Sequence, residues 1–280
     1  MPKRVSTARG REFGAGVRAA LNQAGLTSRA AAEIMDWDEG KLSNVINGKV
    51  AITQLEAAVL LGACRIAADE TMHLLSLHPG THMRNWWQQH GTCAPIRHRT
   101  FNENLASAET LVDWQTHTVP LLLQTNDYMR EAVRASSTAP AVELSQRVRE
   151  RLVTQQLLQR GVKCTFYVHE LALHLRVGGP EVYAAQLLHI LFMANRPRIV
   201  VRVLPASLGA HAGMAGPFTR LTFTAHEPLV WVETENSSII AEAKDTVSGY
   251  EEVIRSLNEN SLDEVESKEL ILHLHERIER

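Results

Sequence analysis

The sequence has little of what secreted and membrane proteins need. It has three cysteines, Cys64, Cys93 and Cys164, and their odd number and wide spacing favour a reducing compartment over a disulfide framework. No apolar run approaches the ~20 residues that cross a membrane. The basic start is not followed by the apolar segment of a secretory signal. The composition therefore predicts a cytoplasmic protein with no membrane partner.

A strong net charge is also absent, but the formal value of −2 conceals an asymmetry. Residues 1–53 hold eight Lys and Arg against five acidic residues, whereas residues 251–280 hold four against nine. A weakly basic N-terminal region is compatible with DNA, although strong DNA binders are usually more basic. The acidic C-terminal region offers either a docking surface for a partner or a solvated face.

The length and the apolar content allow two packed domains. We predict a mainly α helix-turn-helix domain over residues 1–75, a connecting segment over 76–100, and an α+β domain over 101–280 with a small, largely antiparallel sheet. Apolar spacing predicts helices over 101–115, 126–135, 141–160, 180–194 and 246–258, and a last helix that a Ser261–Glu264 capping box opens. Alternation predicts strands over 164–168, 199–204 and 238–241, and a hairpin of 218–224 with 229–234.

Four short helices are predicted between residues 13 and 61, after a flexible basic arm of eleven residues. Thr27 can cap the second helix, residues 36–38 form a tight turn, and Asp38 can cap the third helix. Such a crossing of two helices presents the start of the third helix to the major groove. The candidate DNA-binding residues are Thr27, Ser28, Arg29, Glu39, Lys41, Ser43, Asn44, Asn47 and Lys49.

Residues 25–48 (GLTSRAAAEIMDWDEGKLSNVING) resemble the helix-turn-helix of Xre-type, lambda-repressor-like regulators. The C-terminal part is similar to the large C-terminal domain of actinobacterial Xre-type regulators, in the WhiJ-like and antitoxin-like group. The motifs that carry this likeness are VPLLLQTNDY at 119–128, GGP at 178–180, RP at 196–197, VLP at 203–205 and GAHAGMAGPF at 209–218. The resemblance implies a homodimeric regulator that binds double-stranded DNA and a very small partner protein encoded nearby.

The third helix departs from that family at several positions. Glu39 stands where Gln or Ser is usual, Asn44 where Arg is usual, and Ile46 where Glu is usual. Asn44 favours adenine through N6 and N7, where Arg would favour guanine, and Glu39 can accept from cytosine N4. Gly40 weakens the helix by up to ~1 kcal/mol relative to Ala. The family's target sequence is therefore not expected here.

Three alternatives stay open from the sequence. The chain can be an antitoxin-like interaction module with little DNA binding, a regulator that senses a small-molecule effector, or an enzyme with its site in residues 100–280. No catalytic set, cofactor motif or metal-ligand spacing is present, so we expect no enzyme, no cofactor and no metal. His211 in the glycine-rich segment lines a ligand pocket or belongs to a tightly turning loop.

Overall fold

A computed structural model of the chain describes residues 6–78, 83, 85–89, 96–136, 141–234 and 237–278. The chain divides into two compact units, Met1–Trp86 and Trp87–Arg280, which we call the helical unit and the sheet unit. Lys3 and Arg4 of the predicted basic arm, and Cys93, lie outside the described residues. No helix in the described ranges is long and apolar enough to span a membrane.

The helical unit consists of short capped helices around an apolar core. The four predicted helices are present as α1 (Ala8–Gln23), α2 (Ser28–Ile34), α3 (Glu39–Ile46) and α4 (Gln54–Ala63), and α5 (Ala68–Leu77) follows them. Thr7, Thr27, Asp38 and Thr53 cap the first four helices, each by accepting a backbone N–H from the first turn. The core side chains include Phe13, Val17, Leu42, Val45, Leu60, Leu61 and Leu74.

The flexible arm of eleven residues is wrong from residue 8 onward. Helix α1 already begins at Ala8, because Thr7 caps it and Ala8 is fully buried. Arg9 is held by the same unit, since its guanidinium donates to the Ser76 carbonyl over 2.7 Å and lies 4.7 Å from the Trp86 ring. Arg9 is thus a packing residue of the helical unit.

Within the described residues the sheet has seven strands, in the order β1-β7-β6-β5-β2-β3-β4. The strands are β1 (Asn85–Gln89), β2 (Thr110–Gln115), β3 (Lys163–His169), β4 (Ile199–Leu204), β5 (Phe218–Thr222), β6 (Leu229–Glu233) and β7 (Ser237–Ala241). β2 pairs in parallel with β3, and β3 with β4, while β2–β5, β5–β6 and β6–β7 are antiparallel. The β5–β6 hairpin confirms that prediction.

The prediction of a small, largely antiparallel sheet is wrong, because the sheet is seven-stranded and mixed. Two strands were missed: β1 lies in the segment assigned to a connection, and β2 lies inside the helix predicted over 101–115. Helices connect β2 to β3 and β3 to β4, and parallel neighbours need such crossovers.

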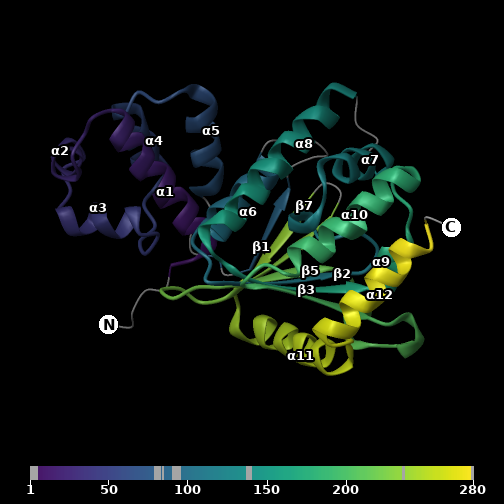
Figure 1. Cartoon of the computed structure of the whole chain (residues 1–280). Coiled ribbons are helices and arrows are strands. Elements are labelled where there is room, and N and C mark those ends of the chain that lie inside the picture. Colours follow the sequence, from purple (N-terminus) through teal and green to yellow (C-terminus); the bar gives the residue numbers. More distant parts are fainter. Residues whose placement is uncertain are drawn as a thin grey trace. The chain divides into compact units, whose positions relative to one another are not determined.

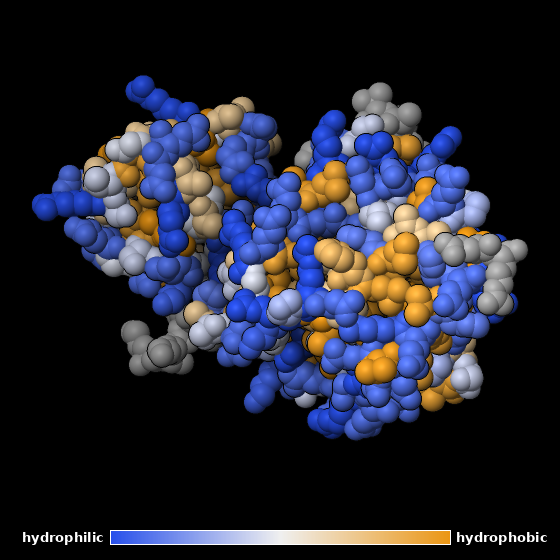
Figure 2. All heavy atoms as spheres, in the orientation of Figure 1, coloured by the Kyte–Doolittle hydropathy of each residue, from blue (hydrophilic) through white to orange (hydrophobic). Residues whose placement is uncertain are grey.

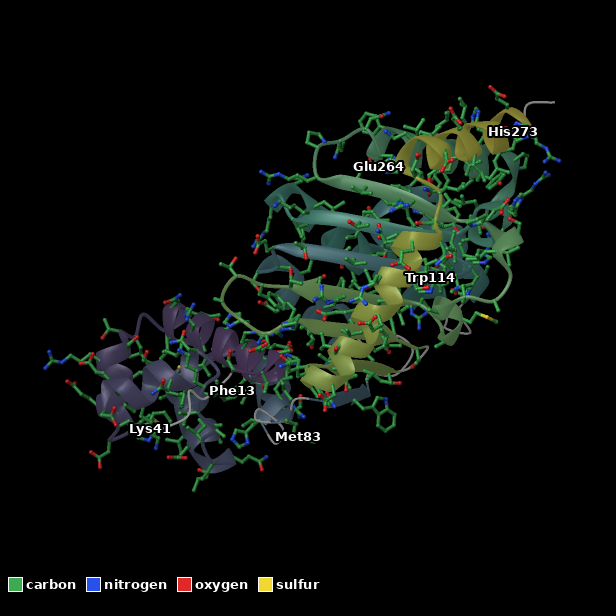
Figure 3. The ribbon with its side chains drawn as sticks, turned by 90° about the horizontal axis from the view of Figure 1, so that it is seen from below. Phe13, Lys41, Met83, Trp114, Glu264 and His273 are labelled. Carbon is green, nitrogen blue, oxygen red and sulfur yellow. The ribbon has the colours of Figure 1, made fainter. Side chains whose placement is uncertain are left out.

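Helices lie on both sides of this sheet. Figure 1 shows α6 (Ile96–Ala106), α7 (Asn126–Ser136), α8 (Ala141–Gln156) and α10 (Gly179–Met193) on one side, and α11 (Lys244–Asn260) on the other. Trp114 of β2 points toward α11, in a buried cluster with Tyr167, Phe218 and Leu257 (Figure 3). Since side chains alternate along a strand, Leu111, Asp113 and Gln115 face the opposite side, toward α6 and α8.

Helix α12 (Glu264–Glu276) follows a backbone contact with the edge strand β4. The Leu262 N–H donates to the Val203 carbonyl, and the Ser267 hydroxyl accepts from the Val203 N–H, both over 2.9 Å. These bonds satisfy an edge position that would otherwise offer free backbone groups. The capping box of α12 is formed by Asp263 and Glu266, so the predicted pair of Ser261 and Glu264 is wrong.

Candidate functional site

The first candidate site is the α2–α3 pair of the helical unit. A tight turn separates the helices, with Asp36 in the left-handed region at φ 52° and the Trp37 N–H returning to the Ala32 carbonyl over 2.9 Å. The Asp38 carboxylate then caps α3 by accepting from the Lys41 N–H over 2.8 Å. The turn and the cap together fix the direction in which α3 leaves α2.

Close backbone contact with α1 fixes the other end of α3. A Cβ added at Gly14 would lie 2.2 Å from the Ile46 carbonyl oxygen, so only glycine allows α1 to approach this closely. Leu42 and Val45 are buried beneath the helix, at 0% and 1% exposure. The apolar side of α3 is therefore fully packed, and its polar side faces solvent.

Three of the predicted contact residues share that exposed side. Glu39, Ser43 and Asn44 are exposed, and Glu39 and Ser43 are one helical turn apart. Lys49, beyond the helix, is also exposed. The structure therefore leaves exposed Glu39 and Asn44, for which the sequence predicts base contacts, together with Ser43 and Lys49.

Lys41 lies on a different side of α3 and has partners within the unit. Its ammonium donates to a Glu56 carboxylate oxygen over 2.7 Å and lies 4.2 Å from the Trp37 ring centroid (Figure 3 labels Lys41). The pKa of Glu56 is lowered to about 2, mainly by the hydrogen bond from Lys41 and also by the hydrogen bonds from the Thr53 N–H and hydroxyl. Lys41 thus ties α3 to α4.

The remaining predicted residues also have local partners. The Asn47 amide donates to the Ser43 carbonyl over 2.8 Å, and its oxygen accepts from Arg18 over 3.4 Å. The Thr27 hydroxyl accepts from the Ala30 N–H over 3.1 Å, which caps α2. Arg29 pairs with Glu33 over 3.2 Å, and Ser28 is exposed at the start of α2.

The second candidate site is a pocket in the sheet unit, which sequence reasoning missed. It has a volume of about 270 Å³ and is lined from β2, β5 and β6, from α6 and α8, and from the segment after β2. The apolar lining includes Phe101, Leu111, Leu121, Leu122 and Trp231. The polar lining comprises Asp113, Gln115, His117, Thr118, Arg151, Thr219, Glu233 and Thr234.

Asp113 is the buried carboxylate of this pocket. It is 5% exposed, at a central position of β2 opposite Thr219 of β5. The Gln115 amide and the Thr219 hydroxyl both donate to its Oδ1, each over 3.0 Å. The pKa of Asp113 is raised to about 6, mainly because burial disfavours the charged form and also because the Glu233 charge lies nearby. The two hydrogen bonds act in the opposite direction and lower the pKa.

Two aromatic side chains form the apolar wall beside Asp113. Phe101 of α6 and Trp231 of β6 meet edge to face, with ring centroids 5.4 Å apart. Trp231 pairs with Thr219 across β5 and β6, so it lies on the same face of the sheet as Asp113. The pocket can therefore hold an apolar body with one polar end.

His211 lies away from this pocket. Its Nδ1 accepts from the Gly213 N–H over 3.1 Å, and its ring centroid is 5.5 Å from Trp114 and 5.4 Å from His169. The Trp114 indole in turn donates to the Gly213 carbonyl over 2.9 Å. The glycine-rich segment therefore packs as a tight loop against Trp114, which was the second of the two alternatives.

Exposed apolar side chains gather on another surface of the sheet unit. Figure 2 shows an orange region over α10 and α12. The exposed apolar residues of α9 (Glu170–His174), α10 and α12 are Leu171, Leu188, Phe192, Val265 and Leu272. Apolar patches on a surface commonly mark contacts with other proteins.

The fold and the two candidate sites define a two-part chain, with a helix pair that exposes polar groups and a sheet unit with a partly buried acidic pocket. Residues 99–273 match the family described as "Domain of unknown function (DUF5753)", and the chain belongs to that family. No curated protein and no solved structure matches the chain.

Proposed function

We propose that this protein is a cytoplasmic, sequence-specific DNA-binding transcription regulator, similar to the Xre-type group, and that it acts as a homodimer. The observation that carries the proposal is the exposed polar side of α3, on a helix that is capped by Asp38 and packed through Leu42 and Val45. A helix that enters the major groove needs such a rigid base with free polar groups on the other side.

In this proposal Asn44 and Glu39 read base edges and Ser43 contacts the backbone. Asn44 pairs with adenine N6 and N7, and Glu39 accepts from cytosine N4. The exposed Lys49 and the N-terminus of α2 at Ser28 supply phosphate contacts. Lys41 keeps its hydrogen bond to Glu56 and has a structural role in the helical unit. A dimer reads two half-sites about 10 bp, or a multiple of that, apart.

In this proposal the sheet unit binds the molecule that regulates DNA binding. A small partner protein encoded nearby, or a small-molecule effector, binds it and shifts the affinity for DNA through linkage. The apolar surface over α10 and α12 supports a protein contact, and the pocket around Asp113 supports a small molecule. The proposal assigns binding, and no catalytic step, to this pocket.

Selection from random double-stranded DNA, followed by binding curves on the selected site, tests the DNA-reading role. Asn44→Ala should cost roughly 1–3 kcal/mol of specific binding and relax the preference at one base position. Asn22→Ala is the matched control, because Asn22 is exposed on α1 of the same unit. Equal binding of wild type and Asn44→Ala to every sequence would remove Asn44 from the reading surface.

A second candidate function is an interaction module with little DNA binding. The acidic side chains Asp36, Asp38 and Glu39 around the start of α3, and the engagement of Lys41 by Glu56, favour it. Salt dependence separates the two functions, since phosphate contacts weaken steeply between low and moderate salt. DNA retention without sequence preference at low salt, and none at moderate salt, supports the module.

A further inference from the structure

The pocket of the sheet unit contains a buried carboxylate that accepts hydrogen bonds from neutral side chains. Two carboxylates, Asp113 and Glu233, and one guanidinium, Arg151, line it. Asp113 is the buried one, and its two hydrogen bonds come from the neutral side chains of Gln115 and Thr219. A buried carboxylate is costly to ionise unless a cation or strong donors balance it.

The position of the Asp113 carboxylate suits a ligand contact. Both hydrogen bonds end on Oδ1, so Oδ2 is the oxygen that can accept from a bound molecule. Asp113 also lies at a central position of β2, where the backbone of β2 is paired with β3 on one side and with β5 on the other. The carboxylate is therefore held rigidly by the sheet, as a site that orients a ligand requires.

The rest of the wall defines the other end of the ligand. Phe101 and Trp231 offer an aromatic corner, and Leu111, Leu121 and Leu122 extend the apolar surface. The volume of about 270 Å³ accommodates one ring-sized or branched body. A cation beside an aromatic face is also attracted by the ring quadrupole.

We propose that this pocket binds a small molecule that presents a protonated amine to Asp113 and an apolar body to Phe101 and Trp231. The amine forms a charge-assisted hydrogen bond with Oδ2 and so places a positive charge beside the Asp113 carboxylate. The apolar body fills the space between the sheet and helices α6 and α8. The amine is then the class of small-molecule effector for the proposed regulator. Only its effect on DNA binding rests on that proposed function; binding to the pocket does not.

The test is a binding titration of the full chain, without DNA, against paired probes. The amines are phenethylamine, tryptamine and isoamylamine, and each is compared with its alcohol: 2-phenylethanol, tryptophol and isoamyl alcohol. At least one amine should bind with one site per chain and roughly tenfold or more tightly than its alcohol, because only the amine forms the charged hydrogen bond.

Asp113→Asn is the decisive variant. It keeps an acceptor for Gln115 and Thr219 at Oδ1 and removes only the charge, so the amine should lose its advantage over the alcohol. Asp127→Asn is the matched control, because Asp127 is exposed on α7 of the same unit and does not line the pocket. A preference for the amine that survives in Asp113→Asn, or that is lost in both variants, overturns the proposal, as does the absence of any amine preference in wild type.

The pH profile of amine binding, measured for the wild-type chain and for Asp113→Asn, provides a further check. The affinity for the amine should fall as the pH drops below about 6, because Asp113 then binds a proton. Glu233, His117 and Arg151 also line the pocket, and the Cys164 thiol beneath it stays neutral, since burial and Asp113 raise its pKa to about 12. These four groups are unchanged in Asp113→Asn, so the difference between the two profiles reports Asp113. The pKa of Asp113 is about 6, so a wild-type affinity for the amine that stays constant between about pH 5 and about pH 8 contradicts the proposal.

These measurements separate the amine site from the regulator function. If no DNA site is selected but the amine preference is present, the pocket assignment stands and the DNA-reading role fails. If a DNA site is selected and no amine is preferred over its alcohol, the pocket assignment fails and the DNA-reading role stands.

Discussion

The helical unit and the sheet unit differ in where they place their polar chemistry. In the helical unit the candidate contact residues Glu39, Ser43 and Asn44 are exposed, over a core of apolar side chains. In the sheet unit the main candidate, Asp113, is 5% exposed and its pKa is raised to about 6 by burial. An exposed helix face suits a large, rigid partner such as DNA, whereas a buried carboxylate suits a molecule small enough to enter the pocket.

A truncation in the core beneath α3 tests whether the position of its exposed face depends on the packing of its buried side. Leu42→Ala should destabilise the helical unit by about 2–5 kcal/mol, because Leu42 is fully buried and its truncation leaves a cavity. Thermal or denaturant unfolding followed by circular dichroism measures it. Leu55→Ala is the control, since Leu55 is 74% exposed on α4 and should change stability by less than about 0.5 kcal/mol. Similar losses in the two variants would mean that α3 is not packed as described.

The next effect tests whether Asp113 is buried as a carboxylate. The folded chain holds the Asp113 proton more tightly than the unfolded chain, since the pKa is about 6 instead of 3.8. This carboxyl group therefore lowers the stability as the pH rises from about 4 to about 6, by an amount on the order of 2–3 kcal/mol.

Asp113→Asn removes that titration. The variant should be more stable than wild type at about pH 8, and this advantage should disappear as the pH falls toward about 4. Unfolding curves of both proteins across this range measure the difference. An advantage that is constant with pH would show that Asp113 does not titrate between those values.

The smallest effect concerns the ion pair that joins α3 to α4. Lys41→Met should cost only about 0.2–1 kcal/mol, because both side chains are about one-third exposed and water screens them. Glu56 has a lowered pKa, so the contribution of the pair is present above its usual pKa and is lost as the pH falls toward about 2. Lys49→Met, at an exposed position outside the pair, is the control.

The Lys41→Met variant also tests whether Lys41 contacts a DNA phosphate or has only a structural role. If Lys41 serves only the shape of the unit, Lys41→Met leaves the salt slope of DNA binding unchanged, whereas loss of a phosphate contact reduces it by about 1. A reduced slope in Lys41→Met and an unchanged slope in Lys49→Met would reverse the roles given to these two lysines.

The sequence predicted the two units unequally, for physical reasons. Local signals define the helical unit: Thr27, Asp38 and Thr53 are caps, and the apolar spacing of four gives each helix its buried side. The strands β3 to β7 were also predicted, because they are apolar runs between turn residues. Strand β2 was missed because Phe101 and Leu105 start a helical spacing that Leu111 and Trp114 extend.

The pocket could not be predicted from the sequence, because its walls come from distant segments. Asp113, Thr219 and Glu233 meet only after β2, β5 and β6 pair side by side. One signal was present, an acidic residue inside the apolar run of residues 111–114, since a carboxylate at a buried strand position is uncommon. The helix assigned to that segment concealed it.

The proposed function has two parts: α3 reads DNA, and a molecule bound to the sheet unit changes this reading. Binding of genomic fragments to the purified chain should be measured at two salt concentrations, with and without the proposed small partner protein. We expect that a specific site is retained at moderate salt and that the proposed partner protein changes its retention. Retention of nothing beyond a salt-sensitive background would contradict this expectation.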